Sequence, residues 1–200
     1  MAYSDFTLPK VQADFGLLFT ETTEVFTNTE KITPSDRLSE TLAEGIPLAL
    51  AIASEKARSE LIITPILLEV RRRAEQLVSL FSGVNFVVSP EKGLTGFCDF
   101  ILSCSPEQYF ITKPVVTIVE AKNDNINSGL GQCAAEMVAA QLFNDIAQEE
   151  NFPVYGVVTT GTNWKFLKLL DSTLFIDLRE YYINEIDSIL AILLTTVKGR

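Results

Sequence analysis

Apolar residues recur at helical spacing over one long stretch in the first half of the chain. Residues 48–81 (LALAIASEKARSELIITPILLEVRRRAEQLVSLF) combine this spacing with strong helix formers, and the pair Ser82-Gly83 that follows is a common helix stop. Pro65 inside the stretch predicts a kink or a restart, with Thr64 as the N-cap of the second part. The basic run Arg71-Arg72-Arg73 is expected on a solvated face of this helix.

Beyond this stretch the pattern changes to short β-rich runs separated by turn residues. Strands are predicted at residues 84–89, 94–104, 115–122, 154–160, 164–170 and 174–177. An Ala-rich helix from residue 130 to about 148 interrupts them, and an amphipathic helix over 182–197 closes the chain. A helix, three strands, a helix and further strands predict an α/β fold, with a central mixed β-sheet flanked by helices on both faces.

The chain carries no internal repeat and no Gly/Ser- or Pro-rich linker, so a single domain over residues 1–200 is expected. Residues 1–45 are expected to form a polar, Thr-rich lead-in with a short helix and a strand or hairpin. Residues 46–170 form the core, and residues 171–200 add a C-terminal strand and helix. No apolar run is long enough to cross a bilayer and no secretory signal opens the sequence, which predicts a cytoplasmic protein without membrane contact.

The composition excludes several kinds of chemistry. The sequence contains no histidine, which rules out Ser-His-Asp and Cys-His catalysis and the usual zinc sites with mixed ligands. The three cysteines, Cys98, Cys104 and Cys133, lie in apolar patterns and are expected to be buried, reduced thiols. Catalysis by this chain would therefore use carboxylates, lysine or amide side chains, with or without a hard metal ion.

The net charge of −10 disfavours non-specific binding of nucleic acid, because an acidic surface repels a polyanion. The excess of acid is uneven, however. Residues 51–140 carry ten acidic and eight basic side chains, whereas residues 1–50 carry eight acidic and three basic ones. A local basic groove is therefore compatible with the middle of the chain. The run Trp164-Lys165-Phe166 fits either a nucleic-acid surface or, more simply, core packing.

Three charged residues come together if the predicted strands 94–104 and 115–122 pair. Glu120 and Lys122 are two residues apart on a strand and therefore share one face. Asp99 lies among apolar residues, where a carboxylate is costly unless a cation, a hydrogen-bond donor or a metal receives it. Asp99 and Glu120 can then converge on one divalent cation, Mg²⁺ or Mn²⁺, beside Lys122. Such an ion could activate water, while the lysine orients the nucleophile or assists its deprotonation.

The stretch GFCDFILS…VVTIVEAKND, with Asp99 followed after about twenty residues by Glu120-Ala121-Lys122, resembles the PD-(D/E)XK (restriction-endonuclease-like) nuclease superfamily and its uncharacterised bacterial branch. The resemblance covers residues 50–170 in the order of elements, although its motif is short. It implies a restriction-endonuclease-like core, Mg²⁺ binding by the Asp and the Glu, and a lysine that serves the attacking water. Cys98 departs from the proline that the family name indicates.

The same resemblance implies two supporting residues. A glutamate on the first core helix often supports the site, and by position this residue is Glu60 or, less directly, Glu55. A glutamine on the helix after the motif commonly faces the site, and by position this residue is Gln132. The glutamate has an ordinary alternative, because half the glutamates on a long helix are simply solvated.

Two functions remain open at this point. The first is a Mg²⁺-dependent endonuclease that hydrolyses DNA phosphodiester bonds. Because the chain alone would bind DNA weakly and carries no target-recognition domain, this function requires a homodimer or a partner subunit. The second is a catalytically silent nuclease-like fold that acts as a protein-interaction or assembly module. A third interpretation takes the three charged residues as an ordinary ion-pair network.

Overall fold

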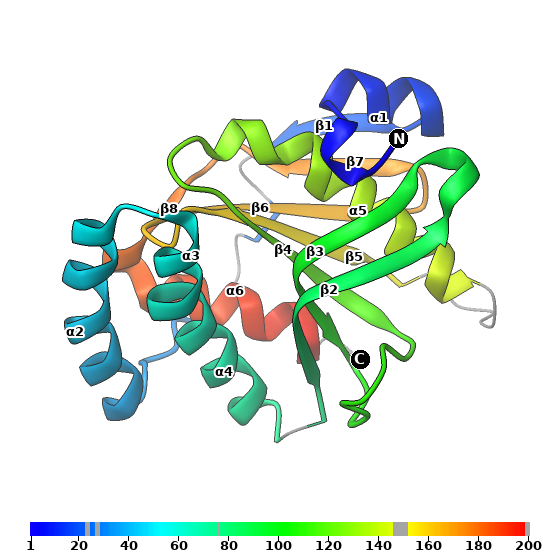
Figure 1. The fold of residues 1–200 in the computed structure, drawn as a ribbon. Coiled ribbons are helices and arrows are strands. Elements are labelled where there is room, and N and C mark those ends of the chain that lie inside the picture. The colour runs from blue at the N-terminus through cyan, green and yellow to red at the C-terminus, as the bar shows by residue number, and fades with distance from the viewer. Residues whose placement is uncertain (23–24, 27–28, 76, 146–151, 199–200) are drawn as a thin grey trace.

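The computed structural model describes residues 1–22, 25–26, 29–75, 77–145 and 152–198 (Figure 1). The described helices are α1 (Leu8–Phe15), α2 (Asp36–Ile52), α3 (Glu55–Arg58), α4 (Thr64–Arg73), α5 (Leu130–Asp145) and α6 (Ile186–Lys198). The described strands are β1 (Leu18–Thr22), β2 (Ser79–Ser89), β3 (Leu94–Ser103), β4 (Val115–Ala121), β5 (Val154–Thr159), β6 (Asn163–Leu170), β7 (Thr173–Asp177) and β8 (Tyr181–Tyr182). Short 3₁₀ turns lie at Tyr3–Asp5, Pro90–Lys92, Ile126–Gly129 and Ile183–Glu185, and a π-helical turn, Ser59–Ile63, joins α3 to α4.

One mixed sheet holds these strands in the order β1-β7-β6-β5-β4-β3-β2, with β8 paired to β6. β4 and β5 run parallel, as do β1 and β7, and the other neighbours are antiparallel. The predicted α/β class with a mixed sheet is therefore confirmed. β4 lies between β3 and β5 and is buried along its whole length, so the two charged residues at its end emerge from the interior of the sheet.

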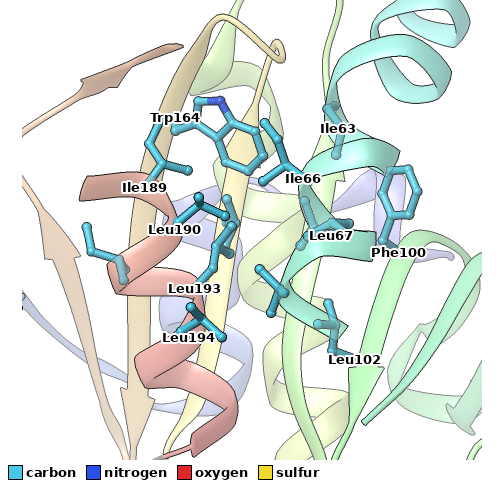
Figure 2. Packing of buried hydrophobic residues seen from close by; sticks show 14 of the residues in the cluster. Ile63, Ile66, Leu67, Phe100, Leu102, Trp164, Ile189, Leu190, Leu193 and Leu194 are labelled. Carbon is cyan, nitrogen blue, oxygen red and sulfur yellow. The ribbon is translucent and has the colours of Figure 1, made fainter. Parts of the chain in front are cut away.

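Helices cover both faces of the sheet, and each layer encloses a hydrophobic core. On one face, Figure 2 shows Ile66 and Leu67 of α4 facing Leu193 of α6, with Trp164 of β6 beside them. The other face carries α1 and α5. Gly156 of β5 lets α5 approach closely, because a Cβ at that position would collide with the sulfur of Met137. This close approach brings the first turns of α5 against the end of β4.

The helical region begins earlier than its apolar pattern predicts. α2 starts at Asp36, inside the segment expected to be a lead-in, because the hydroxyl of Ser35 accepts the Leu38 N–H at 3.2 Å and caps the helix. Pro47 lies inside α2, on an exposed side, where it removes a single backbone donor without ending the helix. The helix ends instead at Ile52, because Ala53 adopts a left-handed conformation with φ of 55°. The short helix and strand expected within residues 1–45 are confirmed as α1 and β1.

The predicted N-cap at Thr64 and the helix stop at Ser82-Gly83 are wrong. The chain does not restart at Pro65: the Thr64 N–H donates to the Ser59 carbonyl, and the resulting π-helical turn gives the proline ring room within a continuous helix. α4 then ends at Arg73, and β2 begins at Ser79 because residues 79–82 pair with β3. The β-ladder with Phe100–Ser103 outweighs the helical pattern of the sequence at this point.

The arginine run at the end of α4 is more than a solvated face. The Glu69 carboxylate is buried, and it accepts hydrogen bonds from Arg72 at 2.5 Å, from Arg73 at 2.8 Å and from the Ser35 hydroxyl at 3.0 Å. Burial opposes ionisation of Glu69, but these donors and the charge of Arg72 lower its pKa. Glu69 therefore ties the start of α2 to the end of α4.

Trp164 and Phe166 are fully buried, which confirms core packing for that strand. The predicted helix over 130–148 corresponds to α5, although residues 146–148 lie outside the described part of the chain. The closing helix begins at Ile186 rather than at residue 182, because Tyr181–Tyr182 pairs with β6. No described helix is long and apolar enough to span a membrane.

The cysteines differ from one another in burial. Cys98 and Cys133 are buried, as predicted, whereas Cys104 is only half-buried, so the prediction is wrong for that residue. No disulfide joins cysteines of the described chain. Burial raises the pKa of both buried thiols, together with the nearby charge of Glu136. Neither thiol therefore ionises readily, and both serve as small apolar side chains of the core.

Candidate active site

Asp99 and Glu120 meet where the β3–β4 ladder ends. Phe100 pairs with Val119, so one further step of the same register would place Asp99 opposite Glu120. The backbone ladder stops before that step. In its place, the Ala121 N–H donates to Oδ2 of Asp99 at 2.8 Å. The carboxylate of one strand thus substitutes for a backbone carbonyl of the ladder and is fixed beside Glu120.

Lys122 and Gln132 join this pair of acids. The Glu120 side chain is 1% exposed, and its Oε1 accepts a hydrogen bond from the Lys122 ammonium. Nζ of Lys122 also lies 3.5 Å from Oε1 of Gln132, in the first turn of α5. The backbone N–H of Lys122 donates to the Thr159 carbonyl of β5 at 2.8 Å, which holds the lysine at the end of the sheet. The structure therefore brings together four of the residues singled out in the sequence.

Glu136 is a member of this group that sequence reasoning did not single out. It lies four residues after Gln132 on α5, it is fully buried, and its Oε1 accepts a hydrogen bond from Nε2 of Gln132 at 3.1 Å. This bond fixes the amide orientation of Gln132, so that its carbonyl oxygen faces Lys122. The signal available in the sequence was a single acid within the run CAAEMVAA, where every neighbour is small or apolar.

The environment of these acids penalises negative charge. Burial and the charge of Asp99 raise the pKa of Glu120 to about 8, although the Lys122 ammonium acts in the opposite direction. Burial and the charge of Glu120 raise the pKa of Glu136 well above its ordinary value. Burial lowers the pKa of Lys122, but the charges of Glu120 and Glu55 outweigh this effect and raise it. The cluster contains more carboxyl groups than cations, so an added cation would stabilise it.

A cavity of about 240 Å³ opens beside Asp99. Its walls come from the start of the helical layer and from β2 and β3, and they are formed by Glu55, Lys56, Ser59, Glu60, Thr64, Ser82, Gly83, Asp99 and Phe100. Asp99 therefore forms part of the cavity surface. Its charge also acts on the buried Glu120–Lys122 pair by raising the pKa of Glu120. A ligand that enters this cavity reaches the site from its Asp99 side.

The two glutamates proposed for the first helix both line this cavity, but they have different surroundings. The Glu60 side chain is 60% exposed and forms an ion pair with Lys56 at 2.7 Å. An exposed pair of this kind contributes little to stability. The charge of Glu55, in contrast, raises the pKa of both Glu120 and Lys122. Of the two glutamates, Glu55 is therefore the one whose charge acts on the buried pair.

This site offers two carboxylates, those of Asp99 and Glu120, as possible ligands for a metal ion. Among the described residues, no group of three or more His, Cys, Asp or Glu side chains is arranged to hold a metal ion. Asp99 and Glu120 form a pair of acids, and Oε2 of Glu120 is buried without a hydrogen-bond partner in the described part of the chain. This set suits Mg²⁺, which usually keeps several waters and takes one or two protein carboxylates.

Replacing Glu136 by glutamine is expected to change how stability depends on pH. Burial and the charge of Glu120 favour the protonated form of Glu136 in the folded protein, whereas the unfolded chain loses this proton above the ordinary pKa of 4.5. The Glu136 contribution to the free energy of unfolding therefore falls as pH rises above that value, by at most about 1.4 kcal/mol per pH unit. Glu136→Gln removes this contribution, so the stability of the variant relative to the wild type should rise as the pH increases above the ordinary pKa of 4.5.

Chemical denaturation at several pH values measures this difference. Glu40→Gln, which changes an exposed glutamate of α2, is the matched control and should follow the wild type at every pH. Parallel stability curves for the wild type and Glu136→Gln would show that Glu136 is ionised in the folded protein, contrary to the expectation.

Comparisons of the chain with models of known protein families, with curated proteins and with solved structures give no match. No relative therefore assigns a role to these residues, and the functional argument depends on their contacts, burial and charges. That geometry can hold a hard cation between Asp99 and Glu120 and can present the Lys122 ammonium beside it. The same geometry offers a surface cavity as the route for a ligand.

Proposed function

We propose that the protein is a Mg²⁺- or Mn²⁺-dependent endonuclease that hydrolyses DNA phosphodiester bonds, with a restriction-endonuclease-like core of the PD-(D/E)XK kind. One observation carries the proposal: Asp99, Glu120 and Lys122 lie together where the β3–β4 ladder ends, and Asp99 also lines a surface cavity. An ordinary ion-pair network would not need a second acid fixed at the same point beside an already buried pair.

Asp99 and Glu120 would hold the ion, and the buried unpartnered oxygen of Glu120 supports this assignment. When bound, the ion would neutralise negative charge at a phosphate and make a nearby water more acidic. The chain's own contribution is to fix the two carboxylates. The Ala121 N–H sets the orientation of Asp99, and the burial of Glu120 restricts its side chain to one arrangement.

Lys122 supplies a positive donor at the reacting centre in this proposal. Its ammonium is held between Glu120 and Gln132, so it can donate a hydrogen bond to an oxygen of the substrate or to the attacking water without a change of rotamer. Gln132 is held in turn by Glu136. The fully buried Glu136 thus holds Gln132, and Gln132 in turn contacts Lys122 at the reacting centre. These contacts fix the position of the lysine before a substrate binds.

The overall charge shapes the expected mode of action. With a net charge of −10, the chain is expected to bind DNA weakly by itself, so we include a homodimer or a partner subunit in the proposal. A second copy or a partner would add the contacts that select a cleavage site.

Incubation of the wild-type protein with plasmid, linear duplex and single-stranded DNA tests the proposal. Cleavage is expected with Mg²⁺ or Mn²⁺, and none is expected with a chelator, because the two carboxylates alone cannot neutralise a phosphate. The activity should coincide with the protein peak in size-exclusion chromatography. Absence of cleavage with every substrate, together with absence of Mn²⁺ binding in calorimetry, would favour the alternative of a catalytically silent interaction or assembly module.

A further inference from the structure

A second cavity lies between α2 and α4, on the outer side of the helical layer. Its volume is about 280 Å³, and residues of both helices line it. α2 and α4 themselves lie side by side (Figure 1). Its walls are formed by Arg37, Leu38, Thr41, Pro65, Leu68, Arg71 and Arg72. Three arginines therefore line one cavity together with apolar residues, and no acidic residue belongs to its lining, although the chain as a whole is strongly acidic.

Two of these arginines lack a counter-ion within the described structure. Arg72 donates to the Glu69 carboxylate at 2.5 Å and is thereby partly neutralised. Arg37 and Arg71 form no ion pair among the described residues, and Nε of Arg71 is buried without a hydrogen-bond partner there. A buried donor without a partner is costly, and a guanidinium without a counter-charge attracts an anion. The cavity therefore contains two arginines whose positive charge is not balanced by an acidic side chain of the described structure.

We infer that this cavity binds a phosphate group of a DNA strand. Guanidinium groups match phosphate in geometry because they donate in a planar fork, and they dominate sites where phosphate is recognised. Leu38, Pro65 and Leu68 give the cavity apolar walls against which the sugar next to the phosphate can pack. Contacts of this kind to the phosphate backbone of DNA position a strand without reading its base sequence.

The place of the cavity fits a strand that also reaches the active site. Thr64 lines the cavity beside Asp99, and the next residue, Pro65, lines the arginine cavity. The two cavities therefore adjoin the same turn of helix. The inference rests on the proposed function, since it assigns the arginine cavity to the DNA that Asp99, Glu120 and Lys122 would cut. It also explains how an acidic protein could hold a polyanion at one place on its surface.

Binding of fluorescein-labelled DNA, single-stranded and duplex, measured by anisotropy in the presence of a chelator, tests the inference. Arg71→Ala is expected to weaken binding about tenfold, and Arg37→Ala with Arg71→Ala about a hundredfold. The slope of binding against salt concentration should fall by about one for each arginine removed. Arg179→Ala, which removes an exposed arginine paired with Glu185, is the matched control and should change the affinity less than about twofold.

Three further measurements make the outcome decisive. Thermal unfolding of each variant shows whether the fold persists, and Arg71→Lys should retain part of the affinity if charge matters. Equal DNA affinity for the wild type and the folded double variant would overturn the inference, as would absence of DNA binding by the wild type. If inorganic phosphate raises the unfolding temperature of the wild type but not of Arg71→Ala, while DNA affinity is independent of both arginines, the cavity binds a free phosphate and its assignment to DNA is wrong.

Failure of the proposed function gives a different result. Because binding is measured without divalent metal, DNA affinity that depends on the arginines can persist in a protein that cleaves nothing. That combination would reject the nuclease and keep the phosphate cavity. If the wild type cleaves DNA but its arginine variants bind DNA normally, the nuclease is kept and the phosphate cavity is rejected.

Discussion

Exchange of Asp99 for asparagine is expected to lower Mg²⁺-dependent DNA cleavage by at least about a thousandfold, with little change in the unfolding temperature. Asparagine keeps a side-chain oxygen that can accept the Ala121 N–H, so the junction between β3 and β4 is retained. What the variant loses is the negative charge that would hold the cation. Binding of Mn²⁺, measured by calorimetry, should be lost together with cleavage.

Lys122→Met separates the two parts of this expectation. Methionine fills a similar space but has no ammonium, so cleavage should fall at least about a thousandfold while Mn²⁺ binding is retained within a few-fold. Asp124→Asn, which changes an exposed acid two residues further along the chain, should have no effect on either measurement. Equal cleavage by wild type and Lys122→Met would indicate a contaminating nuclease. Unchanged Mn²⁺ binding by Asp99→Asn would remove the metal site from the proposal.

Strand geometry explains which parts of the site could be predicted from the sequence. Glu120 and Lys122 are two residues apart, and the alternation of side chains along a strand is enough to place them together. The pairing of β3 with β4 could also be expected from their order. The register between the two strands could not, because a shift between Leu102 and Ser103 alters it within the ladder. The exact partner of Asp99, the Ala121 N–H, therefore required the structure.

The burial of Glu136 shows a limit of helical periodicity. A spacing of four residues places Glu136 on the same side of α5 as Gln132, but a polar side of a helix is ordinarily exposed. Here α5 contacts β4 and β5 on one side and is covered by α1 and the N-terminal turn Tyr3–Asp5 on another. Nearly every side of the helix is thus buried, and a carboxyl that a pattern would assign to solvent becomes part of the site.

Local sequence preferences predicted a helical layer and a break near Pro65, but not the conformations that the chain adopts at these points. Nothing in the spacing of apolar residues indicates that Ala53 adopts a left-handed conformation or that Pro65 is accommodated by a π-helical turn. The arginine cavity depends on how α4 packs against α2. Arg37 and Arg71 are 34 positions apart in the sequence, and only this packing brings them to one cavity.

Truncation of Trp164 to alanine is expected to have the largest effect on stability. Trp164, the only tryptophan of the chain, is fully buried among α4, α6 and β6 (Figure 2), and its Nε1 donates to the Gly161 carbonyl at 2.9 Å. The cavity left by an indole costs about 3–5 kcal/mol, a large part of the total stability of a domain. For a chain of this length, that loss lowers the unfolding temperature by roughly 6–20 °C.

Replacement of Trp164 is also expected to affect the candidate active site. Trp164 pairs with Thr159 across β5 and β6, and the Thr159 carbonyl receives the Lys122 N–H, so loosening of this core should also loosen the lysine.

Circular dichroism follows unfolding, since the intrinsic tryptophan signal is removed with the side chain. Trp164→Phe should lose less stability, because it keeps most of the buried volume and gives up only the N–H. Tyr109→Ala removes an aromatic ring that is 98% exposed and should stay within about 0.5 kcal/mol of the wild type. An unfolding temperature of Trp164→Ala close to that of Tyr109→Ala would mean that this side chain does not support the core between α4 and α6.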